Sequence, residues 1–199
     1  MLSGIGEANH LKEKGINVVN DLKGVGKNLQ DHTSCILYTR SKSRLPYGIS
    51  LPTLPNLAWW VLDYLFRRKG LFASNIFESG GFYRTNPKLD RPDIQHIFMP
   101  AYRQPPPNML AYGHGYSLNI ILLRPESRGS IHIRDKTPGS EPAIRPNFLA
   151  DEIDRAALTA GLRIARDVAA QPALASYVDF EMQPGPEIET DDELIAYAR

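Results

Sequence analysis

Proline and glycine divide this 199-residue chain into short segments, and this feature limits the folds open to it more than any other. The sequence holds 16 prolines and 15 glycines. Proline has no backbone N–H to donate within a helix or a central strand, and glycine favours chain reversals. The longest apolar run, around residues 57–66, is interrupted by Asp63 and is too short to span a bilayer. We therefore expect a turn-rich globular chain without a transmembrane segment.

Short runs bounded by Gly, Pro or Asn predict the strands of a sheet. They cover residues 33–38, 78–83, 93–99, 116–123 and 130–134. In the last run, Ile131 and Ile133 alternate with His132 and Arg134, which is the pattern of a half-buried antiparallel strand. We expect an exposed loop at residues 103–115. The connections between these runs are short enough for antiparallel pairing.

Helices are expected on either side of these strands. They cover residues 7–14, residues 55–69, a segment capped by Asp151 or Asp154 and ended by Pro172, and a last helix opened by a capping box of Thr190 with Glu193. In the second helix, Trp59, Leu62 and Phe66 can line one face. Strands in the middle and helices toward both ends indicate an α+β fold with a mainly antiparallel sheet flanked by helices.

Composition and motifs exclude several classes of function. A net charge of +1 gives no strong field that would attract nucleic acid or an anionic membrane surface. A single cysteine, Cys35, excludes an internal disulfide framework and a multi-cysteine zinc site, and the five histidines are not spaced as metal ligands. The chain contains no G-x-G-x-x-G after a strand, no P-loop and no G-x-S-x-G motif. We therefore expect no metal centre and no nucleic-acid partner.

The densest cluster of polar side chains is the run Asn28-Leu29-Gln30-Asp31-His32, which follows Gly24-Val25-Gly26. Its amides, carboxylate and imidazole could hydrogen-bond the polar parts of a large cofactor. An Asx-rich turn that satisfies its own backbone, with Leu29 packed inward, explains the same residues equally well. The residues alone do not decide between these two interpretations.

Glu78 in the run Glu78-Ser79-Gly80-Gly81-Phe82 is the second candidate. A carboxylate beside two glycines, which allow close backbone approach, could line a pocket and hold a cation or a hydroxyl group. The alternative is an edge-strand glutamate that faces water. A third candidate, the Gly4-Ile5-Gly6 turn, could offer N–H groups to an anion, but a plain turn is the favoured interpretation.

Several blocks together resemble the glucose–methanol–choline (GMC) oxidoreductase family. The blocks are SGIG, HLKEKGI and DLKGVGKNLQDH near the start, then RPESRGSIHIR, then EPAIRPNFLADEIDRAALTAGLRIARDVAAQPAL. They occur in the order and spacing of the family, and the resemblance runs from residue 1 to residue 199. The ESGGF, GHGY and SRG elements are most similar to those of choline dehydrogenases and long-chain alcohol dehydrogenases.

The resemblance implies an FAD-dependent enzyme that oxidises the CH–OH group of choline or an aliphatic primary alcohol by hydride transfer to the flavin. It implies that residues 1–35 are a partial segment of the FAD-binding domain and that residues 36–199 belong to the substrate domain. It places Asn28, Asp31 and His32 near the flavin as cofactor-binding residues. Glu78 matches a substrate-binding glutamate of choline-oxidising members, although related alcohol dehydrogenases also carry an acid in this context.

Two further residues lie in elements that the resemblance covers. His114, in the GHGY element, is expected to have a structural role at the entry to the strand at residues 116–123. Arg128, in the SRG element, is expected to anchor the start of the strand at residues 130–134.

The resemblance also implies an internal fragment. The G-x-G-x-x-G of the family lies upstream of SGIG, and its catalytic histidine and partner His or Asn follow Arg199, so no catalytic residue is assigned. We expect the isolated chain to lack turnover and to bind FAD weakly or not at all. The alternative is a stand-alone, catalytically inactive binding module derived from the substrate domain.

The expected partners are a small alcohol and an unidentified electron acceptor. We expect a cytoplasmic location, with peripheral association with a membrane left open.

Overall fold

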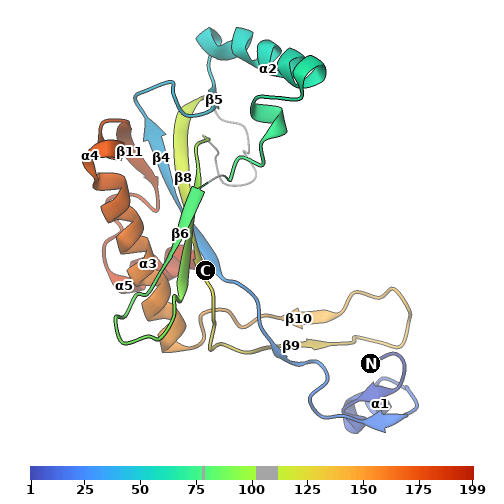
Figure 1. Cartoon of the computed structure of the whole chain (residues 1–199). Helices are drawn as coiled ribbons and strands as arrows, with labels where there is room; N and C mark the ends of the chain where they lie inside the picture. Colours follow the sequence, from blue (N-terminus) through green and yellow to red (C-terminus); the bar gives the residue numbers. More distant parts are fainter. Residues whose placement is uncertain (78, 102–111) are drawn as a thin grey trace. The chain divides into compact units, whose positions relative to one another are not determined.

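The computed structural model describes residues 1–77, 79–101 and 112–199, and it divides the chain into two compact units (Figure 1). The first unit contains residues 1–33 and 124–155, and the second contains residues 34–123 and 156–199. Each unit is therefore built from two separate stretches of sequence. The assignment of residues 1–35 to a cofactor domain and residues 36–199 to a substrate domain stays a prediction.

The first unit holds two small sheets. β1 (Ile5–Gly6) pairs in parallel with β2 (Asn20–Asp21), and α1 (Ala8–Glu13) lies between them in sequence. β3 (Lys27–Leu29), β9 (Gly129–His132) and β10 (Ala143–Arg145) form an antiparallel sheet in the order β10-β9-β3. Residues 27–29, expected in a loop, thus form a strand because β9 supplies their partners.

The glycine turn at the start of the first unit serves the local backbone. Gly4 has a φ of +79°, and a Cβ at this position would lie 2.4 Å from the carbonyl oxygen of Asn17. Its own N–H donates to the carbonyl of Met1, and its carbonyl accepts from Val19 and Asn20. These bonds agree with the plain-turn interpretation, since the Gly4 N–H already has a partner.

The second unit is built on one antiparallel sheet. Its strands are β4 (Ser34–Ser41), β6 (Ser79–Tyr83), β7 (Ile94–Met99), β8 (Gly113–Leu122) and β11 (Val178–Gln183), in the order β11-β4-β8-β7-β6. β5 (Gly48–Ile49) pairs with the first residues of β8. The predicted α+β fold with a mainly antiparallel sheet is confirmed.

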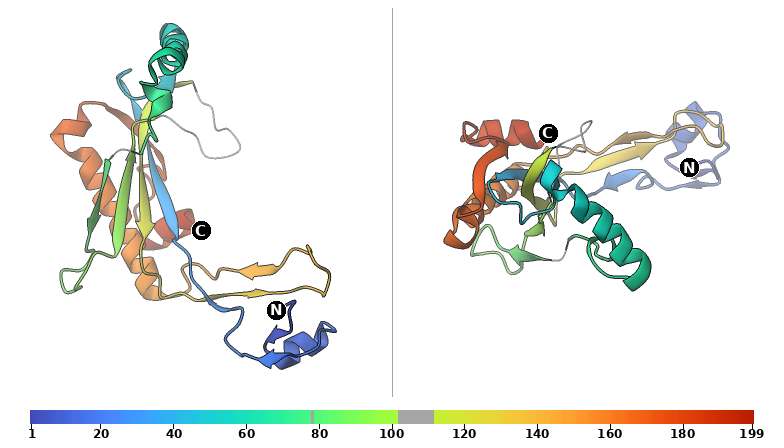
Figure 2. Two further views of the ribbon diagram at one scale, coloured as in Figure 1. Left: turned by 45° about the vertical axis from the view of Figure 1, so that its right-hand side comes forward. Right: turned by 90° about the horizontal axis from the view of Figure 1, so that it is seen from above.

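α3 (Glu152–Ala170) packs on one face of this sheet, as Figures 1 and 2 show. Its residues Leu158, Leu162 and Ala165 are buried, as the apolar spacing predicts. The helix approaches the sheet closely at Gly161, where a Cβ would lie 2.8 Å from the side chain of Ile120. α4 (Pro172–Ala175) and α5 (Asp191–Ala198) follow, and α5 buries Leu194.

α2 (Leu54–Arg67) lies between two short 3₁₀ turns, Leu51–Thr53 and Leu71–Ala73. The helix was expected from the sequence, and the face expected to carry Trp59, Leu62 and Phe66 is exposed. No residue of α2 is buried. The side turned toward the rest of the unit carries Trp60, whose ring meets that of Tyr47 at 5.5 Å between centroids.

Two strand expectations also need correction. Residues 113–115 belong to β8, not to a loop, because Gly48 and Ile49 pair with its beginning; residues 103–111 of that expected loop lie outside the described residues. All residues of β9 are half-buried, so the alternation expected for residues 130–134 does not appear. β9 is the central strand of its small sheet, with β10 and β3 hydrogen-bonded to its two edges.

Candidate functional site

The sheet face opposite α3 carries both polar and apolar side chains that are at least partly exposed. The register of β6, β7 and β8 places Phe82, Gln95, Ile97 and Asn119 on this face. Phe82 is 61% exposed, and the other three are half-buried. A groove of about 280 Å³ runs along it, lined by Phe77, Ser79, Gly80, Phe82, Gln95 and Ile97. A small molecule could lie there against apolar side chains and the Gln95 amide.

Glu78, the predicted substrate residue, lies outside the described residues. Its neighbours in sequence, Phe77 and Ser79, both line the groove. The structure therefore gives no test of the role of Glu78, which stays a prediction.

Asn119 is a polar residue that the sequence interpretation missed. It lies in the register between Ile97 of β7 and Ile36 of β4, and its Oδ1 is buried. Among the described residues, none hydrogen-bonds this oxygen. A buried acceptor without a donor costs about 1–3 kcal/mol, and a ligand hydroxyl could supply the donor. An asparagine inside the apolar run LNIIL was the available signal.

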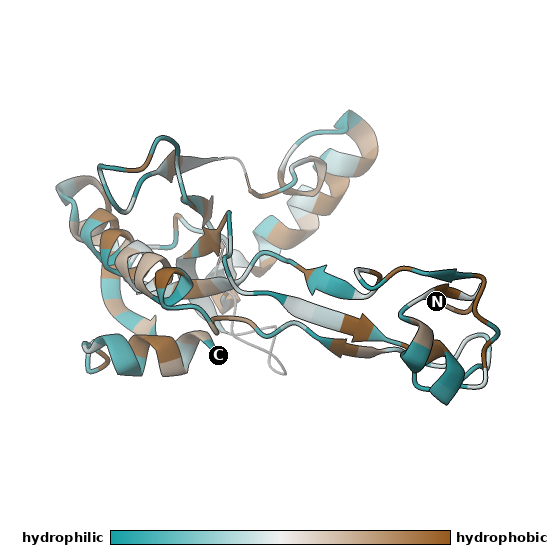
Figure 3. Cartoon of the chain, turned by 90° about the horizontal axis from the view of Figure 1, so that it is seen from below, coloured by the Kyte–Doolittle hydropathy of each residue, from teal (hydrophilic) through white to brown (hydrophobic). Residues whose placement is uncertain are grey.

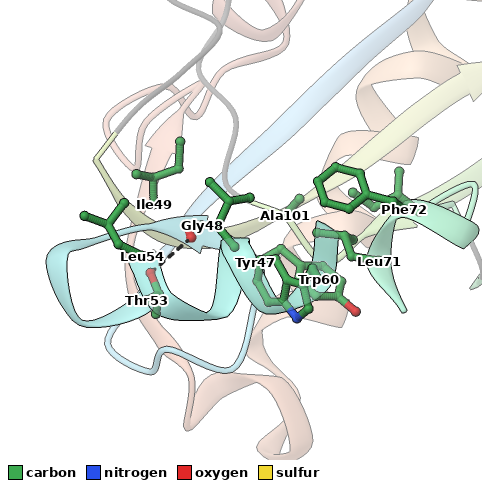
Figure 4. Close-up of a pocket in the computed structure, with 11 residues that line it drawn as sticks. Tyr47, Gly48, Ile49, Thr53, Leu54, Trp60, Leu71, Phe72 and Ala101 are labelled. Atoms are coloured by element: carbon green, nitrogen blue, oxygen red, sulfur yellow. Dashed lines mark hydrogen bonds between the residues drawn. The ribbon is translucent and has the colours of Figure 1, made fainter. Parts of the chain in front are cut away.

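A second, apolar cavity of about 240 Å³ lies under α2 (Figure 4). Its lining includes the aromatic rings of Tyr47, Trp60 and Phe72 and the aliphatic side chains of Ile49, Leu54, Leu57, Leu71 and Ile76. No charged residue is among the described residues that line it. Such a cavity suits a small apolar group, with Thr53 and Tyr47 as polar neighbours.

His114 hydrogen-bonds both ends of the segment 46–50, whose middle residues line this cavity. Its side chain is buried, with Nδ1 2.8 Å from the carbonyl oxygen of Pro46 and Nε2 2.9 Å from Oγ of Ser50. Since a carbonyl only accepts, Nδ1 donates and Nε2 of the neutral ring accepts from the Ser50 hydroxyl. Both ring nitrogens are engaged within the protein, which agrees with the expected structural role.

The predicted cofactor loop lies in the first unit. Asn28, Asp31 and His32 are all exposed, and Asn28 has a left-handed φ of 62°, which asparagine tolerates. An Asp31 carboxylate oxygen accepts from the backbone N–H of His32 at 2.8 Å. The loop thus satisfies part of its own backbone, while its exposed amide, carboxylate and imidazole are of the types that bind the polar parts of FAD. Cofactor contact stays a prediction.

Arg128 also behaves as a structural residue. Its Nη1 donates to the carbonyl oxygens of Pro125 and Ser127, and its own carbonyl accepts from the side chain of Asn147. These bonds fix the turn that leads into β9, as the sequence interpretation expects.

The covered face of the sheet holds the buried titratable groups. His96 Nε2 lies within hydrogen-bonding reach of the Tyr83 hydroxyl and of the Gly161 carbonyl oxygen. Burial lowers the pKa of His96 and raises that of Tyr83, and it raises the pKa of Cys35 to about 12. These groups are neutral and enclosed, so they stabilise the layer between sheet and helix and are not candidates for proton transfer to a substrate.

Comparison with known proteins finds a family that part of the chain matches. Residues 125–199 match the family described as GMC oxidoreductase. The whole chain is 42% identical over 199 residues to an alcohol dehydrogenase [acceptor] of Pseudomonas putida, and covers 36% of that protein. The chain is therefore similar to GMC oxidoreductases over residues 125–199 and to this alcohol dehydrogenase over its whole length.

A second relative is similar over the whole chain. An oxygen-dependent choline dehydrogenase of Staphylococcus aureus is 36% identical over 200 residues, which are 100% of this chain and 35% of the relative. The chain thus spans about a third of the length of the curated relatives that it matches.

Solved structures share the fold. The formate oxidase of Aspergillus oryzae superposes with a TM-score of 0.86 at 24% identity, over 99% of this chain and 39% of that one. An FAD-dependent oxidoreductase of Chaetomium thermophilum gives a TM-score of 0.79 at 24% identity, over 98% of this chain and 40% of that one.

Proposed function

We propose that this chain is part of an FAD-dependent oxidoreductase that converts the CH–OH group of an alcohol to a carbonyl. The observation that carries the proposal is the 42% identity, over the whole chain, to a protein named as an alcohol dehydrogenase. When bound, FAD supplies the redox chemistry by accepting a hydride, and the protein positions and polarises the alcohol.

The residues of this chain contribute binding and orientation. Asn28, Asp31 and His32 would hydrogen-bond the polar parts of FAD, since their side chains are exposed and of both donor and acceptor types. In the second unit, Asn119 Oδ1 would accept a hydrogen bond from the alcohol hydroxyl, because this buried oxygen otherwise has no donor among the described residues. No residue of the chain is assigned as the catalytic base.

An aliphatic primary alcohol is the favoured substrate. The cavity under α2 is lined by apolar side chains and by no described charge, which suits an alkyl chain. Choline is the second candidate, because Tyr47 and Trp60 bring two aromatic faces to the same cavity and aromatic rings attract quaternary ammonium groups. The similarity to a choline dehydrogenase supports this candidate as well.

The test uses the longer enzyme that the proposal implies, purified with FAD. Adding a primary alkanol without air should bleach the visible flavin absorbance, and choline should do so more slowly at equal concentration. Trp60→Ala should raise KM for the alkanol, whereas the exposed control Val19→Ala should not. Absence of bleaching with either substrate would overturn the proposed reaction, and faster bleaching with choline would overturn the preference.

The isolated chain gives a separate test. We expect no bound flavin and no turnover, in line with an incomplete site. Co-purified flavin that is bleached by an alcohol would contradict this expectation. The alternative, a stand-alone binding module, requires that the coding sequence on either side lack an in-frame G-x-G-x-x-G and a downstream H-P-x-G-T run.

A further inference from the structure

α2 exposes apolar side chains where a surface helix usually carries polar ones. The exposed set comprises Trp59, Val61, Leu62, Leu65 and Phe66, with Trp59 at 60% and Phe66 at 82% exposure. Figure 3 shows the apolar colouring along this helix. Large exposed apolar patches mark surfaces that contact a partner or a membrane.

The charged groups of α2 gather toward the C-terminal end of the helix. Asp63 is one of the less exposed residues and pairs with Arg67 at 3.1 Å. Arg68 lies over the Tyr64 ring, with 5.2 Å from the guanidinium carbon to the ring centroid. On its inner side, the helix packs against the preceding segment through the edge-to-face contact of the Trp60 and Tyr47 rings. The orientation of α2 is therefore fixed by its inner residues, and its apolar face points outward.

The sequence that contains α2 is rich in positive charge. Residues 42–73 contain five cations, Lys42, Arg44, Arg67, Arg68 and Lys69, and a single carboxylate, Asp63, although the whole chain has a net charge of only +1. Two leucines of the same stretch are also largely exposed: Leu45 is 74% exposed and Leu51 is 73% exposed. The combination of an outward apolar face with flanking cations is characteristic of helices that lie in the interface of an anionic bilayer.

We propose that the face formed by α2 and its flanking cations, the α2 face, binds an anionic lipid surface with the helix lying in the membrane plane. A helix of 14 residues is roughly 21 Å long, too short to cross the hydrocarbon core. Among the described residues, no helix combines the length and apolarity that a membrane crossing needs. The helix instead inserts its apolar side chains to the depth of the headgroup boundary, and the cations meet lipid phosphates.

Charge complementarity favours lipid over a second copy of the chain. A symmetric dimer through the α2 face would bring two sets of like charges together, which opposes association. Anionic headgroups neutralise the same charges. Each cation near an anionic membrane surface adds a similar increment to the binding free energy, so several neighbouring cations add to the contribution of the apolar face.

The two tryptophans of the chain, Trp59 and Trp60, provide a built-in probe. Trp59 lies on the α2 face and Trp60 on the inner side. In Trp60→Phe, the remaining Trp59 emission should shift to the blue when vesicles of phosphatidylcholine with phosphatidylglycerol are added. In Trp59→Phe, the Trp60 emission should change little. A shift confined to Trp60, or no shift in either variant, would overturn the proposal.

Vesicle flotation measures binding itself. Trp59→Asp combined with Phe66→Asp should abolish flotation with anionic vesicles, and Arg68→Gln with Lys69→Gln should weaken it by roughly 30-fold. The matched controls Val19→Asp and Ile144→Asp replace apolar residues that are 75% and 56% exposed in the first unit, and they should bind normally. Circular dichroism confirms that each variant is folded.

Two outcomes contradict the proposal. Equal binding to pure phosphatidylcholine would show that charge plays no part. Light scattering that finds a dimer, converted to a monomer by the Trp59 and Phe66 changes without any vesicle binding, would assign the face to a second copy. Flotation is then repeated with the longer enzyme. If other parts of that enzyme bury the α2 face, the enzyme would not bind vesicles.

Discussion

Cys35 shows how burial sets the chemistry of a single residue. Its side chain is 5% exposed, and burial raises the pKa of its thiol to about 12. Because the thiolate is the reactive form, Cys35 should resist modification in the folded chain. We predict that a disulfide reagent such as DTNB labels it at least ~100-fold more slowly in buffer than in denaturant. Fast labelling without denaturant would show that the layer between sheet and helix opens readily.

His96 should make the second unit sensitive to acid. Burial lowers its pKa from 6.5, and the facing groups are the Tyr83 hydroxyl and the Gly161 carbonyl. The unfolded chain therefore takes up a proton at His96 at a higher pH than the folded chain does. The contribution of neutral His96 to the stability of the fold is complete above pH 6.5 and declines as the pH falls toward the lowered pKa of His96 in the folded chain. Urea unfolding followed by tryptophan emission should therefore give a lower midpoint at acidic pH.

Substitutions distinguish the contribution of His96 to the pH dependence of stability from that of the other histidines. His96→Gln should reduce this pH dependence, whereas His32→Gln, at an exposed site, should preserve it. His10 also has a pKa lowered by burial but lies in the first unit, so the tryptophan signal from α2 does not report on it directly. An unchanged pH profile in His96→Gln would contradict the assignment.

Asn119 should behave as a binding residue and not as a stabilising one. Its buried Oδ1 has no donor among the described residues, so an apolar replacement removes a polar atom that costs free energy. We predict that Asn119→Leu leaves the free energy of unfolding within about 1 kcal/mol of the parent or raises it. In the longer enzyme, the same change should lower kcat/KM for the alcohol. A large loss of stability would instead indicate a structural role.

At the scale of elements, Asp154 links the first turn of α3 by hydrogen bonds to residues 126–127, which precede β9. Its buried carboxylate accepts the backbone N–H groups of Glu126 at 2.7 Å and of Ser127 at 2.8 Å. Asp154→Ala would leave the Ser127 N–H buried and the Glu126 N–H part-buried without partners, which should cost about 2–4 kcal/mol. Asp151→Ala removes a single bond to Ile153 N–H near the helix start and should cost about 1 kcal/mol. Urea denaturation of the two variants tests this order, and equal losses would refute it.

The elements also show what could be predicted from the sequence. The Thr190 capping box was predicted and confirmed, because its signal lies within four adjacent residues: Glu193 N–H donates to Thr190 Oγ1, and the Glu193 carboxylate accepts from Thr190 N–H. These bonds also hold the pKa of Glu193 below its ordinary value. For α2, the sequence predicted that Trp59, Leu62 and Phe66 share a face but not where this face points, since the same apolar period fits an inward or an outward orientation. Distant contacts, here those of Tyr47 with Trp60, decide between them.

The candidate site was less predictable for the same reason. Asn28, Asp31 and His32 were found because they are adjacent in sequence. Asn119, by contrast, becomes distinctive only when β4 and β7 flank it and bury its oxygen. Likewise, the cavity under α2 combines segments that are far apart in sequence. Pairwise register across a sheet is a tertiary property that short sequence patterns do not contain.

At the scale of the whole molecule, the two units differ in how much core they possess. Of the buried hydrophobic residues, only Leu11 and Leu149 lie in the first unit, whereas the second holds the rest, from Cys35 to Leu194. A small unit with little buried apolar surface has little stability of its own. We therefore predict that the first unit unfolds at a lower urea concentration than the second. Hydrogen exchange read by mass spectrometry should show early loss of protection at residues 1–33 and 124–150.

This difference also yields a test of cofactor binding that does not depend on catalysis. A ligand that binds only the folded form raises stability in proportion to the logarithm of its concentration over Kd. FAD held by Asn28, Asp31 and His32 would raise the urea midpoint of the first unit and leave that of the second unchanged, as tryptophan emission would report. For the isolated chain we expect no such shift, because the chain alone should bind FAD weakly or not at all. In the longer enzyme we expect a shift that Asn28→Ala with Asp31→Ala reduces, and an unaltered shift in that variant would remove these residues from the cofactor site.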